Sequence, residues 1–481
     1  MAESADDRQA GDERDVALVE LEACARLLGI AADRPAYGPD SFARLTDPDG
    51  LLGDPAGDSG RQGACILCDA LLDRLRNLQQ GQFELEDWCG VVRYVFAALR
   101  KSRVLVNDVA RAEVLVQVLQ LFAASGGSEV EAQRRHAELA FVALVLLVNA
   151  VASAPLSMRW NAVRLDALVE VVRTATDAGR ASALLPFLTT KLESMAERYW
   201  TTRMDDSLEA SRDADDEPAR RRLPLYEAVY RALTSIGEPG GREQHAAPLM
   251  AIETGIRLLA CAAERGVQLP QEEQYVRDVC LRALLHPRYF RFEPLQQLEA
   301  VQRAPLLCRL CRVLAEADGS ALREAMTDAV ADSDVVMSTL RSHQDEVEAK
   351  MRLLMINALC LQAQQMSRAA DATHNVEAAD APIDSVPYDA IAAALQSLEG
   401  DSMIDDQLVE DWVVLTTRAR LVQAKLDQVQ RRVRVLSATP LGAGDRREDW
   451  RMLNDKLSEW RDRLSDMLST VQRANHLHAP A

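Results

Sequence analysis

Two cysteine pairs are the residues of this sequence whose spacing comes nearest to that of a metal site. Cys65 and Cys68 form one Cys-x-x-Cys pair, and Cys308 and Cys311 form the other. Pairs of this kind are the usual halves of a zinc centre, in which thiolates bind the metal. Here each pair lies inside a helical pattern of leucines, and the two pairs are far apart in the sequence. We therefore expect buried, reduced thiols, and a metal-dependent enzyme is the most distant of three functional alternatives.

The histidines do not indicate a catalytic site either. His476 and His478 have the His-x-His spacing of a metalloprotease, but only three residues follow them, too few to supply the Ser and Asp that such a site requires. We interpret them as part of a frayed tail. The sequence has no phosphate-binding or dinucleotide-binding glycine pattern and no nucleophile elbow. These observations predict a protein that is not an enzyme and that has no metal and no cofactor.

Composition limits the partners and the fold. The 481 residues carry a net charge of −19, which argues against a general nucleic-acid binder, so any RNA contact must be local. Aromatic residues make up only 5%, while residues that favour helices dominate. Residues 1–14 are polar and acidic, unlike a leader peptide, and no apolar run is long enough to cross a membrane. We expect a mainly α, cytoplasmic protein that has a disordered tail at 1–14 and does not bind membranes.

Amphipathic helical patterns fill the region 15–343, broken by glycines and prolines and by an acidic loop at 202–221 that we expect to be mobile. Their succession without strands predicts a solenoid of stacked helical hairpins. The expected helices are 15–29, 64–80, 84–101, 107–124, 130–153, 161–178, 184–201, 223–236, 246–265, 271–285, 293–317 and 319–330.

The pattern changes after residue 343. A long helix around 345–365 precedes a short strand at 383–386, and helices at 388–398 and 405–417 follow. Residues 421–435 then alternate with a period of two around a polar turn, as a β-hairpin does. This order predicts a winged helix over 344–438 with an acidic insertion at 367–381. We expect the hairpin strands to present an open edge to a partner.

A last helix is expected at 445–475. Its large apolar residues recur every three or four positions on an otherwise charged helix, a heptad seam that needs partner helices. The two tryptophans could instead line a ligand box, but their heptad positions favour the core of a helix bundle. The seam consists of Trp450, Leu453, Leu457, Trp460, Leu464, Met467 and Val471.

Four segments carry a resemblance to a known family. They are RALLHPRYFRFEPLQQL at 282–298, KMRLLMINAL at 350–359, VEDWVVLTTRARLVQAKLDQVQRRVRV at 409–435 and DWRMLNDKLSEWRDRLSDMLSTVQ at 449–472. Together with the helical array and the winged helix, they resemble the PCI family, and within it the m subunits of eukaryotic translation initiation factor three. The seventh subunit of the signalosome, another PCI protein, is the nearest alternative.

The resemblance implies a non-catalytic scaffold that joins other PCI subunits and reaches the small ribosomal subunit through the complex. PCI wings mostly pair edge to edge, so the wing is a candidate partner-binding surface. Residues 412–475 carry 13 Lys and Arg against 8 Asp and Glu, in contrast to the acidic chain as a whole. This basic face could be simply solvated, could contact an acidic neighbouring subunit, or could contact rRNA or mRNA. The candidate wing residues are Lys425, Arg431, Arg432 and Arg434.

Overall fold

The computed structural model describes most of the chain between residues 58 and 468. The described residues are 58–77, 85–125, 129–155, 157–190, 222–236, 246–328, 335–372, 385–399, 404–441 and, within 457–468, all but 459, 462 and 466. The predicted tail at 1–14, the helix at 15–29 and the loop at 202–221 lie outside them. The described chain forms two compact units, Met1–Val267 and Gln268–Ala481.

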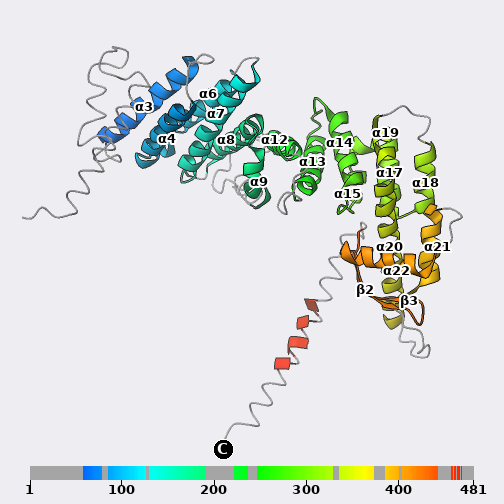
Figure 1. Ribbon diagram of the computed structural model, residues 1–481. Coiled ribbons are helices and arrows are strands. Elements are labelled where there is room, and N and C mark those ends of the chain that lie inside the picture. Colours follow the sequence, from blue (N-terminus) through cyan, green and yellow to red (C-terminus); the bar gives the residue numbers. More distant parts are fainter. Residues whose placement is uncertain are drawn as a thin grey trace, which may run out of the picture. The chain divides into compact units, whose positions relative to one another are not determined.

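The described part of the first unit is entirely helical (Figure 1), as the sequence predicts. Side chains cap two of its helices: Asp108 accepts a hydrogen bond from the backbone N–H of Arg111, and Ser157 from that of Trp160. The helices are α3 (Asp58–Asn77), α4 (Leu85–Lys101), α5 (Val104–Asn107), α6 (Val109–Ala124), α7 (Val130–Val151), α8 (Met158–Asp177), α9 (Ala181–Thr190), α12 (Arg222–Ser235) and α13 (Ala246–Glu264).

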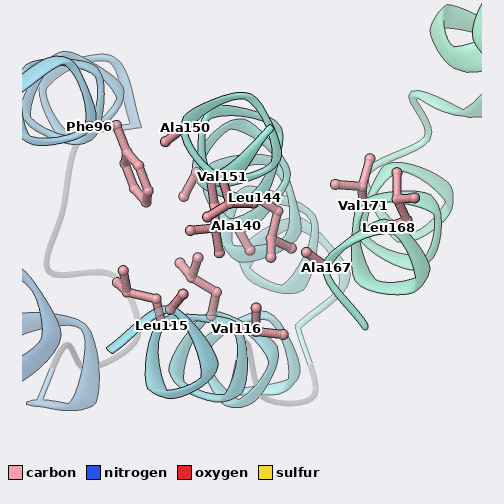
Figure 2. Packing of buried hydrophobic residues seen from close by; sticks show 14 of the residues in the cluster. Phe96, Leu115, Val116, Ala140, Leu144, Ala150, Val151, Ala167, Leu168 and Val171 are labelled. Carbon is pink, nitrogen blue, oxygen red and sulfur yellow. The ribbon is translucent and has the colours of Figure 1, made fainter. Parts of the chain in front are cut away.

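Helix α7 lies among α4, α6 and α8, and its contacts explain the core of this unit. Ala140, Leu144 and Val151 are buried on it at helical spacing and pack near Phe96 of α4 and Leu115 of α6 (Figure 2). Burying a leucine or valine side chain fully contributes about 1.5–3 kcal/mol. Helix α12 in turn packs on α8 and α13, and α4 packs on α7 past the two helices between them, so the helices stack in succession as in the predicted solenoid.

The second unit combines short helices with a winged helix. Its helical part comprises α14 (Glu272–Leu285), α15 (Glu293–Gln296), α16 (Glu299–Gln302), α17 (Pro305–Glu316), α18 (Gly319–Asp328) and α19 (Val335–Ser342). The winged helix comprises α20 (Gln344–Ala372), β1 (Ser385–Pro387), α21 (Tyr388–Glu399), α22 (Asp406–Arg418), β2 (Val422–Asp427) and β3 (Arg432–Ala438). The predicted order of helix, strand, two helices and hairpin is confirmed. The predicted domain limit between 343 and 344 falls inside this unit and stays a prediction.

Three details of the second unit differ from the expectations. The single helix expected at 293–317 is wrong, because Leu298 is extended and Pro305 begins a new helix, with Ala304 before it outside the helical region. Helix α19 was not among the expected helices. The insertion expected at 367–381 begins later, since α20 continues to Ala372.

The sheet has the order β1-β3-β2, with both pairings antiparallel. Since β3 lies in the middle, the expectation that both hairpin strands present an open edge is wrong for β3. Among the described strands, β2 pairs with β3 alone, so its other side is a free edge. Figure 1 shows β2 and β3 beside α20 and α22, on which their inner face packs.

Candidate partner-binding surfaces of the winged helix

The winged-helix sheet has an apolar inner face, as its alternation predicts. Val422, Val433 and Val435 are buried against the helices, and Ala424 and Leu426 are half-buried beside them. The end of β3 is fixed to α20, because Asn357 Nδ2 donates to the Thr439 carbonyl at 2.9 Å. The other side chains of the hairpin therefore form a second face, which points away from α20 and α22.

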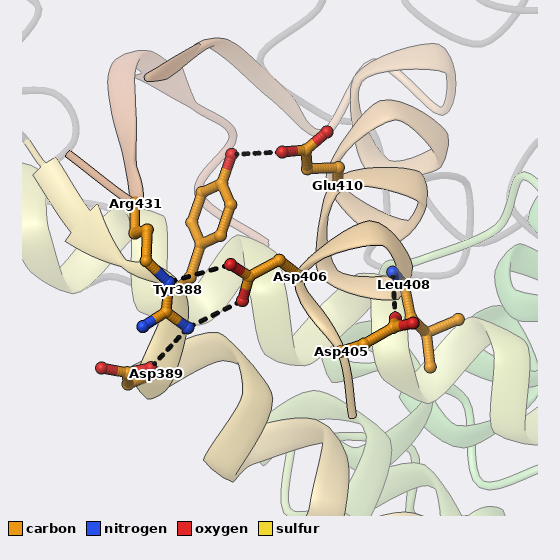
Figure 3. A network of polar contacts seen from close by, with 7 residues as sticks. All are labelled: Tyr388, Asp389, Asp405, Asp406, Leu408, Glu410 and Arg431. Carbon is orange, nitrogen blue, oxygen red and sulfur yellow. Dashed lines mark hydrogen bonds and ion pairs between the residues drawn. The ribbon is translucent and has the colours of Figure 1, made fainter. Parts of the chain in front are cut away.

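Arg431 does not lie on that free face, although the sequence groups it with the other wing cations. Its Nε and Nη2 donate to the two carboxylate oxygens of Asp406 at 2.9 and 2.7 Å, and Nη2 also contacts Asp389 at 3.1 Å (Figure 3). The two acids stand in the first turns of α22 and α21. The Arg431 guanidinium holds the pKa of Asp406 below its usual range, chiefly by hydrogen bonding. Arg431 thus ties the wing to both helices.

A second contact in the same place supports this role. Tyr388 begins α21, and its hydroxyl donates to Glu410 Oε1 of α22 at 3.1 Å (Figure 3). Burial, followed by this hydrogen bond, raises the pKa of Tyr388 to about 12. The Tyr388 N–H donates to the Arg431 carbonyl at 3.0 Å. The sequence prediction for Arg431 did not include these partners. The signal that could have indicated them is a pair of acids in the first turns of two helices, near a turn that contains an arginine.

Lys425 and Arg434 are exposed on the second face of the sheet, where they lie opposite each other on β2 and β3. Over the residues that the structure describes, neither has an ion-pair or hydrogen-bond partner. Arg432 is half-buried on the same face, and its Nη1 lies 3.5 Å from Ser385 Oγ of β1. Three of the four predicted wing residues therefore lie together on one face. The fourth, Arg431, instead joins the wing to α21 and α22.

The predicted C-terminal seam is described in part. Residues 457, 458, 460, 461, 463–465, 467 and 468 are helical. Leu457, Trp460, Leu464 and Met467 have exposed fractions between 55% and 67%. Trp450, Leu453 and Val471 lie outside the described residues. The four described seam residues therefore offer a large apolar stripe that the rest of the described chain leaves open, and its role stays a prediction.

The cysteine pairs lie on helices, as expected. Cys68 of α3 and Cys311 of α17 are buried, and burial raises the pKa of the Cys68 thiol to about 12. A hydrogen bond with Cys280, together with burial, raises the pKa of Cys311 well above its ordinary value. Among the described residues no group of three or more His, Cys, Asp or Glu side chains could hold a metal ion. His476 and His478 lie outside the described residues.

The described helices include none that is both long enough and apolar enough to span a bilayer.

The chain is similar to subunit M of eukaryotic translation initiation factor 3 from several fungi. It is 28% identical to the Aspergillus oryzae protein over 313 residues, which cover 63% of this chain and 55% of that relative. It is 26% identical to the Emericella nidulans protein over 315 residues, which cover 64% and 58%. With the Schizosaccharomyces pombe protein it shares 24% over 201 residues, 42% of each chain. These similarities confirm the resemblance drawn from the sequence. The chain spans about half the length of the first two relatives, and no protein-family model matches it.

Proposed function

We propose that this chain is a non-catalytic scaffold subunit of eukaryotic translation initiation factor 3. It would act in the cytoplasm and support formation of the preinitiation complex on the small ribosomal subunit. The observation that carries the proposal is the similarity to subunit M over 313 residues. The winged helix after a helical array supports it, because PCI subunits use this combination to assemble.

The wing is the first proposed contact with another subunit. The outer edge of β2 is free among the described strands and can accept a strand from a neighbouring PCI wing. Lys425 stands on this edge strand, Arg432 and Arg434 lie on the central strand β3, and Arg431 holds the turn of the wing in place. A proline at a β2 position whose N–H points away from β3 should weaken assembly without unfolding the helices.

The C-terminal stripe is the second proposed contact. Burying its large apolar side chains in a bundle with helices of other subunits contributes about 1.5–3 kcal/mol for each residue. A chain without residues 446–481 should therefore leave the complex and keep its helical content. If the shortened chain unfolds by itself, the stripe packs within the subunit, and the proposed contact with other subunits is wrong.

A matched pair of variants tests the stripe more sharply. In L457D/L464D two charges enter the apolar stripe, whereas S458D/S465D adds the same charges one position further along the same helical segment. We expect the first variant to lose its partners and the second to keep them. Equal retention of partners by both variants would contradict the proposal.

Native mass spectrometry of the complex that copurifies with the tagged chain tests the proposed function directly. We expect subunits of initiation factor 3 in that complex. Signalosome subunits in their place would show that the nearest alternative is right, and a chain without partners would contradict any scaffold role.

A further inference from the structure

The second face of the winged-helix sheet carries two like charges in direct opposition. Lys425 on β2 pairs in register with Arg434 on β3, and both side chains are exposed. Like charges directly opposite each other on neighbouring strands lower the stability of a sheet. The pair therefore lowers the stability of the hairpin. Because folding of the hairpin does not require the two charges, we ask what the face could bind.

The rest of this face defines what could bind there. Arg432 and Leu436 alternate along β3 with the buried Val433 and Val435, so they point the same way as Arg434. Leu436 has an exposed fraction of 59%. We call Lys425, Arg432, Arg434 and Leu436 the outer sheet face. It combines three cations with one large apolar side chain, and Asp427 at the end of β2 stands in register with Arg432, so the cations left without an opposite charge across the strands are Lys425 and Arg434.

The composition of the module favours a protein over RNA on this face. Single-stranded RNA is usually held by aromatic side chains that stack on bases, and the described residues of the three strands include no aromatic residue. Helix α22, which stands where a winged helix presents its recognition helix, carries Asp406, Glu410 and Asp411. These carboxylates repel phosphates, whereas guanidinium groups pair with carboxylates in a planar, bidentate geometry.

We propose that the outer sheet face binds an acidic segment of a partner protein. Carboxylates of that segment would lie against Lys425 and Arg434, and an apolar side chain would cover Leu436. The negative charges would also remove the repulsion between the two cations. This inference rests on the proposed role of the wing in binding partners, and it names the chemistry of what is bound.

Zero-length cross-linking in the purified complex tests the inference. A carbodiimide joins an amine to a carboxylate only where the two are in contact, so Lys425 should form an amide with an Asp or Glu of another subunit. Lys101, an exposed lysine of α4, serves as the control for non-specific coupling. The rate of acetylation of Lys425 gives a second measurement. An equal rate in the complex and in the isolated chain would overturn the inference, because the face would then be uncovered. Ultraviolet cross-links from β2 or β3 to RNA would overturn it in favour of RNA.

Charge reversal supplies the matched variants. K425E places opposite charges across the two strands, so the hairpin should melt at the same or a higher temperature while the partner binds about tenfold more weakly. R288E introduces the same change at another exposed arginine of this unit and should alter binding less than twofold. Unchanged binding by K425E would overturn the inference. Native mass spectrometry of the wild-type complex identifies the assembly independently, so failure of the proposed function can be distinguished from failure of this inference.

Discussion

Among the residues that the structure describes, each of the two units buries one cation at the end of a helix, but the two cations contact different parts of the chain. In the first unit Arg164 has an exposed fraction of 1%, and its guanidinium donates to the carbonyls of Val151, the last residue of α7, and of Ala154 and Pro155 just beyond it. In the second unit Lys350 Nζ donates to the carbonyls of Ala283 and Leu284 at 2.7 and 2.8 Å. These carbonyls end α14, some 66 residues earlier in the sequence.

The comparison shows two ways of satisfying the last carbonyls of a helix. Arg164 closes a turn between consecutive helices, so its contact is local. Lys350 stands near the start of α20, the first element of the winged helix, and fastens that element to the preceding helical part. The Arg164 contact therefore joins neighbouring helices, whereas the Lys350 contact joins segments that are distant in the sequence.

Removing the local cation should have the largest effect. In Arg164→Met the Ala154 carbonyl loses its donor, which costs about 1–3 kcal/mol for a buried group, and the carbonyls of Val151 and Pro155 keep only their backbone donors. We expect the first unit to lose roughly 3–5 kcal/mol of stability, because several hydrogen bonds from a charged donor are lost and each contributes about 1.5–3 kcal/mol. Urea unfolding, followed by hydrogen exchange of α7 and α8, measures the loss. Arg135→Met, at an exposed arginine of α7, is the control and should unfold as the wild type does.

An unchanged midpoint in Arg164→Met would contradict the role given to this cation, because the turn after α7 would then be stable without it. Water would have to satisfy the Ala154 carbonyl, although the side chain that reaches it is buried.

Removing the distant cation should have a smaller effect. Lys350→Met leaves two carbonyls without a donor but also relieves the cost of burying a charge, so we expect a loss of about 1–3 kcal/mol. Hydrogen exchange should quicken in α14 and α20 and stay unchanged in α7 and α8. Faster exchange in the first unit as well would show that the two cations do not act on separate units.

The pH dependence of stability should distinguish the two cations further. Burial lowers the pKa of Lys350 to about 7, whereas an arginine stays charged over the whole accessible range. Below pH 7 the lysine is protonated in both the folded and the unfolded chain. Between pH 7 and its ordinary pKa of 10.5, the unfolded chain holds the additional proton, so stability rises with pH.

Urea unfolding of the wild type and of Lys350→Met at pH 6.5, 7.5 and 8.5 measures this dependence. The difference between the two proteins removes most of the contribution of other groups, including the nearby Glu346 on α20. Cys311 on α17 also faces Lys350, but its pKa in the folded chain is well above 9.0, and its ionisation in the unfolded chain is common to both proteins and cancels in the difference. We expect wild-type stability relative to the variant to rise across these pH values. A flat difference would mean that Lys350 stays charged in the folded chain.

The sequence predicts the local contacts of this protein better than the distant ones. Helical periodicity places Leu144 and Val151 on one buried face whatever packs against it, and the alternation in 421–435 separates the inner from the outer face of the hairpin. The position of β3 in the middle of the sheet depends on β1, which lies about 45 residues earlier and whose pairing no local pattern encodes. The partners of Arg431 are also distant in the sequence, so the local pattern alone places it with the free cations.

The smallest predicted effect concerns Arg431, a cation of the second unit that is also held by distant segments but is exposed. Its partners Asp389 and Asp406 lie 42 and 25 residues away, so by sequence distance it belongs with Lys350. Exposed ion pairs contribute much less than buried ones, and we expect Arg431→Ala to lower the melting temperature of the wing only slightly. Arg434→Ala, its matched control on the outer sheet face, should not lower it at all, because it removes a repulsion.

The pH dependence completes this last test. Since Arg431 lowers the pKa of Asp406, its contribution is present above the ordinary pKa of an aspartate and is lost as the pH falls through the lowered value. The difference in melting temperature between wild type and Arg431→Ala should therefore shrink in acid, whereas the difference for Arg434→Ala should not. A large effect of Arg431→Ala, comparable with that of Lys350→Met, would show that distance in the sequence and not burial determines how strongly a cation holds this unit. A small effect that disappears in acid would show that burial decides it.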